Sequence, residues 1–405
     1  MTMVKDTPNK SGSGIVDIER RSSLKAIGGT LGLIAGGSLS IGSVAGENDP
    51  EPGISVRDAT KVAQQIVKKA SQKEAYRGFT EATVKTPELY YSLTGRRSDT
   101  DVVPSVYVFP VVDGNDHVGH VTTGAQEKMP PVVEYGTDPA PHLETEQTLS
   151  QDGLSPSSER EYLFQGPLSF GISAIDETTG EEYFVNLVSR LTQKLEDTPK
   201  INPSTDHTEG WNTLTNPDKA DLSDVEPLNS GSITDVPNWT DTGYSNWPGC
   251  TPIAAAMCIG YHESFPNRTD IIDGLNDEMN TNPNGRTWPH NMPSGIEGYD
   301  SSYSASNNYT GRPAAAKGGV DSNNPPFVNT LGDKEAGKTD VVSDEVSPSD
   351  WDVLVGHSET VVGYEEEGSW SGTDLYLDTH NTWGSTRTVL VGDYWDTYMI
   401  TTVEP

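Results

Sequence analysis

The sequence predicts an α+β protein with two folded regions, and three patterns support this prediction. Apolar residues between positions 56 and 70 recur at three- and four-residue steps, which is the period of an amphipathic helix. Several segments between 105 and 191 alternate apolar and polar residues, as strands do. An apolar helix of small residues is predicted from 250 to about 261, and two alternating strands follow much later, between 352 and 381.

Composition and charge narrow the classes of function. The chain has 405 residues, enough for two or three domains. Asp and Glu number 60 and Lys and Arg 27, which gives a formal net charge of −33. This charge repels nucleic acid and anionic lipid, so binding to nucleic acid is excluded. No apolar run is long enough to span a bilayer, so no stable membrane anchor is predicted. Two Cys residues exclude a disulfide framework and a multi-cysteine metal site.

The acidic residues are spread along the chain rather than gathered in one tail. This distribution resembles that of haloarchaeal proteins, whose surfaces stay hydrated at molar salt. The resemblance implies a halophilic protein, and an ordinary acidic secreted protein is the alternative.

The N-terminal 45 residues have the features of an export signal. Residues 19–25 are ERRSSLK, and a weakly apolar, glycine-rich stretch follows and ends in Ser43-Val44-Ala45, a small-x-small cleavage pattern. These features resemble a twin-arginine signal peptide. The resemblance implies that the twin-arginine translocase exports the protein and that the mature protein is secreted. Residues 1–45 are therefore left out of the predicted fold.

The first folded region is predicted at 54–192 as a small α+β unit. It begins with the helix at 56–70, where Ser55 and Asp58 form a capping box. A hairpin follows, in which a turn at Asp113-Gly114 joins two alternating segments. The strands predicted in this region are 105–113, 117–125, 130–136, 168–176 and 182–191.

Two details of the hairpin carry predictions. Pro110 cannot donate a ladder hydrogen bond, so its strand is expected at a sheet edge. His117 and His120 lack a nearby acidic third ligand, so we expect surface residues and no metal site.

A linker is predicted at 196–232, because this stretch is rich in Pro, Asp, Asn, Ser and Thr and has almost no apolar periodicity. It leads into a second folded region at 233–405.

Cys250 occupies a position in this second region that suits a nucleophile. A Trp-Pro-Gly loop delivers it to the start of the apolar helix. A helix N-terminus carries partial positive charge and free N–H groups, which stabilise a thiolate. The N–H of the nucleophile itself can help to hold an oxyanion. Cys258 lies on a different face of the same helix and is expected to be a buried thiol.

His357 and Asn381 supply two further groups. A cysteine nucleophile needs an imidazole beside it and a carbonyl or carboxylate that orients the imidazole. His357 lies on a predicted strand, and Asn381 ends the next one. Asp378 is an alternative orienting group, although strand alternation points it to the face opposite Asn381.

Three motifs together resemble the papain-like cysteine peptidases. They are GC-x-P-x-A-A-A-M, GH-x-x-x-VVGY and NTWG. The first is similar to the branch that includes bacteriocin-leader-processing peptidases. The resemblance covers 236–263 and 350–403, and it implies a papain-like domain in which the cysteine-bearing helix packs on an antiparallel sheet. The stretch between them, 264–349, is expected to be largely irregular.

The resemblance also implies the roles of the site residues. Cys250 would be the nucleophile, His357 the general base and acid, and Asn381 the orienting residue. Trp383 would shield the hydrogen bond between His357 and Asn381 from water. No cofactor and no metal is implied.

One position departs from the family pattern. The family places a Gln about six residues before the cysteine, as the side-chain half of the oxyanion hole, and this sequence has Tyr244 there. Asn246 is the nearest side-chain amide, so it is the candidate oxyanion-hole donor.

The first folded region also carries a resemblance. Its segments YVFPVVDGNDHVGHV and MPPVVEYG, which follow a helix, resemble the pro-domain of streptopain-type cysteine peptidases. The sequence therefore predicts a secreted thiol protease that cleaves a protein or peptide substrate through a Cys250 thioester. It would be made as a zymogen, with its own N-terminal domain as inhibitor. Two alternatives stay open: an amidase or acyltransferase that uses the same Cys–His site, and a surface-binding or adhesin module with a degenerate site.

Overall fold

A computed structural model describes most of the chain after residue 50. The described residues are 51–96, 99–152, 154–157, 162–189, 192–198, 206–216, 227–244, 248–263, 267–283, 285–334, 353–369, 372–391 and 398–405. The predicted signal peptide and Asn246 lie outside them.

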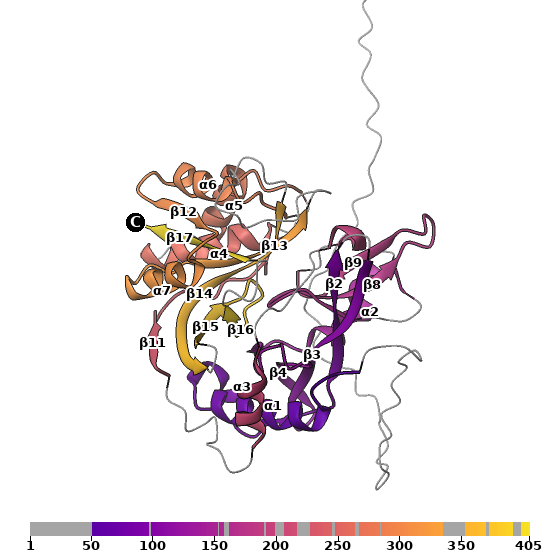
Figure 1. Ribbon diagram of the computed structural model, residues 1–405. Helices are drawn as coiled ribbons and strands as arrows, with labels where there is room; N and C mark the ends of the chain where they lie inside the picture. Colours follow the sequence, from indigo (N-terminus) through magenta and orange to yellow (C-terminus); the bar gives the residue numbers. More distant parts are fainter. Residues whose placement is uncertain are drawn as a thin grey trace, which may run out of the picture.

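The structure is a mixed α+β fold with a large sheet and several helices, which confirms the α+β class of the prediction (Figure 1). The helices, including three 3₁₀ helices labelled η, are α1 Val56–Ala70, η1 Glu74–Phe79, η2 Pro141–Glu144, α2 Thr145–Asp152, η3 Leu195–Asp197, α3 Thr208–Thr215, α4 Cys250–His262, α5 Arg268–Glu278, α6 Asn291–Tyr299 and α7 Arg312–Asp321.

The strands fall into an N-terminal and a C-terminal set. The N-terminal set is β1 Thr83–Val84, β2 Glu88–Arg96, β3 Asp99–Asp113, β4 Asp116–Gly124, β5 Glu134–Gly136, β6 Ser155–Pro156, β7 Tyr162–Phe164, β8 Phe170–Ile175, β9 Glu182–Asn186 and β10 Thr192–Lys194. The C-terminal set is β11 Asn229–Ser232, β12 Ser304–Asn308, β13 Phe327–Lys334, β14 Val353–Ser369, β15 Gly372–His380, β16 Thr386–Val391 and β17 Tyr398–Glu404.

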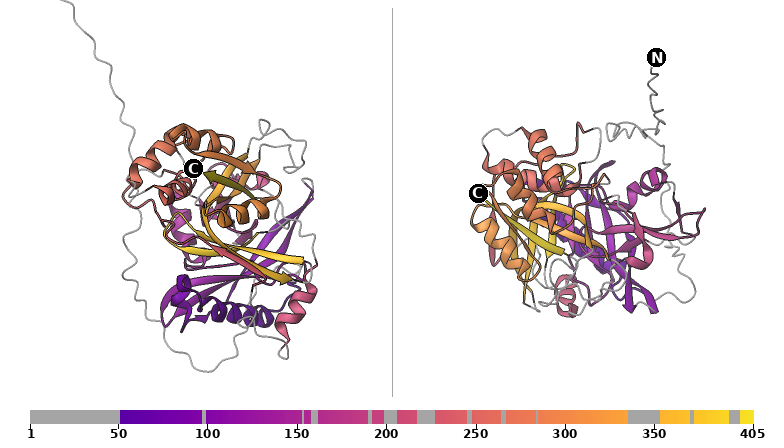
Figure 2. Two further views of the ribbon diagram at one scale, coloured as in Figure 1. Left: turned by 90° about the vertical axis from the view of Figure 1, so that its left-hand side faces the viewer. Right: turned by 90° about the horizontal axis from the view of Figure 1, so that it is seen from above.

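The two sets of strands form one continuous sheet. In the N-terminal set β3 pairs with β2 and β4, and β4 pairs with β5. In the C-terminal set β14 pairs with β13 and β15, and β15 pairs with β16. Strand β5 then pairs antiparallel with β16, with Gly136 opposite Arg387. Figures 1 and 2 show the two regions side by side, with α1 and α3 against the N-terminal strands and α4 to α7 around the C-terminal strands.

Helix α1 begins and packs as its sequence predicts. The Ser55 side chain accepts a hydrogen bond from the backbone N–H of Asp58 and caps the helix. Its apolar face is buried in a core with residues of β3 and β4, including Phe109 and Val121. The helix therefore covers one face of the N-terminal strands.

The prediction that the strand of Pro110 lies at an edge is wrong, because β3 has neighbours on both sides. On one side β1 and β2 follow each other, with β1 paired to Val111 and Val112 and β2 paired only up to Val108. The carbonyl of Pro110 faces this side and accepts from Lys85 N–H. Pro110, which has no N–H to donate, therefore lies at the point where the neighbour of β3 changes from β2 to β1.

Two stretches have more regular structure than the sequence pattern indicated. The segment predicted to be a linker contains α3 and β11, and the buried indole of Trp211 anchors α3 by donating to the Met129 carbonyl at 3.0 Å. The stretch 264–349, expected to be irregular, contains α5, α6, β12, α7 and β13. Its helices are short, and burial of a few apolar residues stabilises them, including Ile271, Leu275 and Ile296.

No helix among the described residues is long and apolar enough to cross a membrane.

Candidate active site

Cys250 is the first residue of α4, as predicted. Gly249 precedes it with φ of +93°, and a Cβ there would lie 2.5 Å from the Gly285 carbonyl oxygen, so only glycine fits. Asn276 holds the approach to the helix by donating to the Pro248 carbonyl at 2.6 Å. No side chain in the described part of the chain caps the helix, so its first N–H groups remain available beside the thiol.

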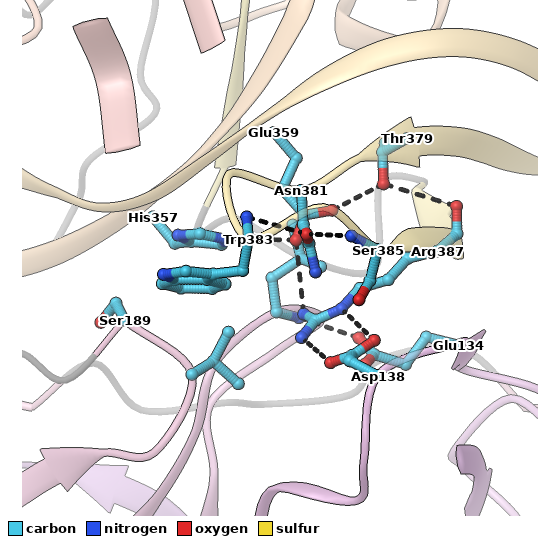
Figure 3. A network of polar contacts seen from close by, with 12 residues as sticks. Glu134, Asp138, Ser189, His357, Glu359, Thr379, Asn381, Trp383, Ser385 and Arg387 are labelled. Atoms are coloured by element: carbon cyan, nitrogen blue, oxygen red, sulfur yellow. Dashed lines mark hydrogen bonds and ion pairs between the residues drawn. The ribbon is translucent and has the colours of Figure 1, made fainter. Parts of the chain in front are cut away.

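Strand β14 brings His357 to this helix. The strand packs against α4, where the Thr360 hydroxyl donates to the Ala254 carbonyl at 2.9 Å. One residue beyond His357, the hydroxyls of Ser358 and Thr251 lie 2.9 Å apart. The His357 ring is fully buried, and the indole of Trp383 stacks on it with centroids 4.7 Å apart and planes at 5° (Figure 3). These contacts fix the ring beside the N-terminus of α4.

Glu359 orients the imidazole, a role the sequence analysis did not assign to it. His357 Nε2 lies 3.1 Å from Glu359 Oε1, and both side chains are fully buried. The Thr379 hydroxyl donates to the other carboxylate oxygen at 2.6 Å. His357 Nδ1 is buried and has no hydrogen-bond partner among the described residues, so it is the ring nitrogen left for the Cys250 thiol.

Asn381 does not make the contact that the family resemblance implies. Its side-chain oxygen accepts from the backbone N–H groups of Trp383, at 3.0 Å, and Ser385, at 2.8 Å (Figure 3). Asn381 therefore shapes the turn after β15 that carries the stacking Trp383. Glu359, rather than Asn381, contacts Nε2 of His357. Trp383 accordingly stacks on the imidazole beside a histidine–glutamate pair rather than a histidine–asparagine pair.

The other candidate side chains, Asp378, Cys258 and His120, make contacts away from the imidazole of His357. Asp378 points to the other face of β15, where it pairs with Lys73 and accepts from Thr388, as strand alternation predicts. Cys258 is buried and its thiol donates to the Ala254 carbonyl, and both cysteines are free. His120, expected at the surface, is fully buried and contacts Glu134 at 3.1 Å and the Asp138 carbonyl at 3.0 Å. No group of described residues has the make-up of a metal site.

The electrostatics favour an ion pair between Cys250 and His357. Burial alone would raise the pKa of the Cys250 thiol, but the side chain and charge of His357 and the Ser358 backbone outweigh it and lower that pKa. Burial alone would lower the pKa of His357, but Cys250 and Glu359 raise it to about 9. The pKa of Glu359 is lowered against the effect of burial, first by Arg387 and then by His357. The imidazolium of His357 and the carboxylate of Glu359 are therefore the favoured forms at neutral pH, and both effects of His357 stabilise the Cys250 thiolate relative to the thiol.

A buried arginine connects this site to the N-terminal region. Arg387 Nη1 lies 3.4 Å from Glu359 Oε1, while Nε donates to Asp138 Oδ1 at 3.1 Å and Nη2 pairs with Asp138 Oδ2 (Figure 3). The arginine lies on β16, and Asp138 follows β5, which pairs with β16. The polar contacts thus run from Asp138 through Arg387 and Glu359 to His357.

No protein-family model matches this sequence, and no curated protein matches it significantly.

Proposed function

We propose that the protein is a cysteine peptidase of the papain-like kind, with Cys250 as nucleophile, His357 as general acid and base, and Glu359 as the residue that orients the imidazole. The Cys250 thiolate attacks the carbonyl carbon of a peptide bond, and the oxyanion forms beside the N–H groups at the start of α4. His357 gives its proton to the leaving amine, which leaves a thioester on Cys250. The neutral imidazole then takes a proton from water as that water attacks the thioester.

The observation that carries this proposal is the buried arrangement in which Cys250 begins α4 and His357 Nε2 lies 3.1 Å from Glu359 Oε1. In this arrangement the pKa of Cys250 is lowered and that of His357 is raised. A structural cysteine in an apolar setting has the opposite shift, and Cys258 in the same helix shows it, because burial raises its pKa. Perturbed pairs of this kind favour a catalytic site over a degenerate one. An amidase or acyltransferase would use the same thioester, and the choice of substrate separates these activities.

Burial of the site supports synthesis as a zymogen. Cys250 is 5% exposed and His357 is not exposed, so we expect part of the covering chain to move before a polypeptide binds at the thiol. The turn after β9 comes from the N-terminal region, and its Ser189 lies on the Trp383 side of the site in the view of Figure 3. Arg286, from the loop that packs on Gly249, donates to the Thr192 carbonyl at 2.8 Å just beyond this turn. The proposal therefore includes the N-terminal region as a cover of the candidate site, together with twin-arginine export and secretion.

Hydrolysis of an unfolded, fluorescently labelled protein in molar KCl tests the function. It should be measured before and after trace protease treatment, so that a latent form is also detected. We expect Cys250→Ala to lose at least about 10³-fold in rate and His357→Ala to lose a similar amount. Cys258→Ala is the matched control and should retain activity, since that thiol faces a helix carbonyl.

Full activity in Cys250→Ala, or loss of activity only in Cys258→Ala, would contradict the assignment. A binding module without catalysis would hydrolyse nothing in either form, and its Cys250 would react with iodoacetamide no faster than free cysteine.

A further inference from the structure

Arg387 and His357 approach the same carboxylate oxygen of Glu359, so the two cations can compete for it. His357 Nε2 and Arg387 Nη1 both approach Glu359 Oε1, at 3.1 Å and 3.4 Å. The imidazole has the shorter contact, and Nη1 makes no hydrogen bond to a described residue. A guanidinium free to move would close on the carboxylate, because charged hydrogen bonds of this kind are strong and arginine favours two parallel ones.

Asp138 holds the guanidinium away from that oxygen. It binds Nε and Nη2 together, which is the two-pronged geometry that fixes the plane of an arginine. Arg387 is 2% exposed, so water does not compete for these contacts. The pKa of Asp138 is lowered against the effect of burial, first by Arg387 and then by His120, so this residue is a carboxylate at neutral pH.

The position of Asp138 is set by the strand pairing between the two regions. Thr137 N–H donates to the Thr386 carbonyl at 3.0 Å, and Thr386 N–H donates to the Thr137 hydroxyl at 3.1 Å. At Gly136 a Cβ would lie 2.6 Å from Asp138 Oδ1 and 2.9 Å from Arg387 Cγ, so the backbone approaches the ion pair as closely as it can. On its other side, His120 contacts the Asp138 carbonyl and carboxylate.

We infer that Asp138 is a positioning residue for His357, acting through Arg387 and Glu359, and that the N-terminal region is therefore a working part of the active enzyme as well as a cover. This inference rests on the function proposed above. It implies that activation moves or cuts the covering chain and leaves β5 and Asp138 in place. An ordinary pro-domain can be discarded, whereas this one supplies an ionic contact that the catalytic pair depends on.

The test is a titration of the His357 ring by NMR in the full-length protein labelled with ¹⁵N-histidine. His357→Ala assigns the signal, and hydrolysis kinetics are measured on the same variants. In the unaltered protein we expect His357 to titrate near pH 9. In Asp138→Asn the guanidinium can turn onto Oε1 of Glu359 and weaken its hold on the imidazolium. We expect the midpoint to fall by about one unit and kcat to fall about tenfold, with KM little changed.

Three further variants separate positioning from a structural role. Asp116→Asn, at the exposed start of β4, should change neither the His357 midpoint nor kcat. Asp138→Glu keeps the negative charge, so the His357 midpoint should fall by no more than half as much as in Asp138→Asn. Asp138→Asn combined with Arg387→Gln should lower kcat no further than Arg387→Gln alone, because Asp138 acts only through Arg387.

Each outcome decides the question. An unchanged His357 midpoint in a folded Asp138→Asn protein would overturn the inference, and so would failure of both Asp138 variants to fold, which would make the contact purely structural. A wild-type His357 that titrates near the ordinary histidine value of about 6.5 would instead overturn the proposed ion pair and the function itself.

Discussion

His357 is held by three groups of different chemistry. The Cys250 thiol interacts with the ring, the Glu359 carboxylate binds Nε2, and the Trp383 indole covers one ring face. Together they fix the tautomer, the charge and the orientation of the imidazole, the three properties that a general acid and base requires.

The first prediction at this scale concerns the orienting group. Glu359→Gln keeps the shape of the side chain and removes its charge, so the imidazolium loses its counter-ion. We expect kcat to fall by about 10²–10⁴, as for the loss of an orienting carboxylate in a catalytic triad. Asn381→Ala should cost less, because that amide holds the Trp383 turn and makes no hydrogen bond with the ring.

Glu366→Gln is the control, since Glu366 lies on the same strand in a partly exposed pair with Lys317. A larger loss of kcat in Asn381→Ala than in Glu359→Gln would show that Asn381, and not Glu359, orients the imidazole.

The second prediction is the pH dependence of hydrolysis. The pKa of Cys250 is lowered against the effect of burial, first by its hydrogen bond to His357, and the rate should rise with pH as its thiolate forms. His357 must be protonated to release the amine, so the rate should fall as pH passes about 9. A bell-shaped profile of kcat/KM is therefore expected. An alkaline limb that stays near pH 9 in Glu359→Gln would contradict the role of Glu359, which helps to raise that pKa.

Sequence patterns located the proposed reacting pair but only part of its surroundings. The motifs around Cys250 and His357 indicated a nucleophile and a base, and the structure brings the two side chains together. Glu359 was also accessible to sequence reasoning, since strand alternation places residues 357 and 359 on one face. The contact between Asp138 and Arg387 was not accessible, because these residues are far apart in the chain and only the β5–β16 pairing joins them.

At the scale of elements, the junction between the loop and α4 controls the position of Cys250, the proposed nucleophile. Gly249→Ala would place a Cβ 2.5 Å from the Gly285 carbonyl oxygen in a backbone conformation with φ of +93°. We expect destabilisation of at least about 1–2 kcal/mol and a loss of activity larger than that destabilisation explains, because Cys250 would shift.

Gly318→Ala is a matched control on an exposed site of α7 with nothing within 4 Å of the added atom. It should leave activity unchanged and stabilise the protein by about 0.5–1 kcal/mol. Thermal melts and kcat measured on both variants give the comparison. Equal effects of the two substitutions would show that the tight turn before Cys250 is not required.

Elements with a clear period were predictable, and those stabilised by distant partners were not. Helix α1, the β3–β4 hairpin, α4 and strands β14 and β15 follow from periodicity and capping. Helices α5 to α7 are short, and their stability comes from burial against distant elements, which local sequence does not encode. The buried apolar residues of α5 and α6 share a core with α4, and those of α7 share one with the C-terminal strands.

At the scale of the molecule, charge dominates the expected response to solvent. The formal net charge is −33, and the excess negative groups repel one another most strongly at low salt. Salt screens this repulsion, because the Debye length is about 30 Å at 0.01 M and about 3 Å at 1 M. We predict that desalting loosens or unfolds the protein and that molar KCl restores it. Circular dichroism and the melting temperature across this range measure the effect, and identical values at low and high salt would contradict a halophilic protein.

The central claim is that Cys250 is a thiolate paired with the His357 imidazolium, and the absorbance of the thiolate near 240 nm tests it most directly. The protein for this titration carries Cys258→Ala, so that Cys250 is its remaining cysteine. We predict a thiolate signal at pH 7 with a midpoint well below the ordinary thiol value of about 8.5, and its loss when His357→Ala is added. A midpoint at or above the ordinary value, unchanged by His357→Ala, would show that Cys250 is a structural thiol and would contradict the account.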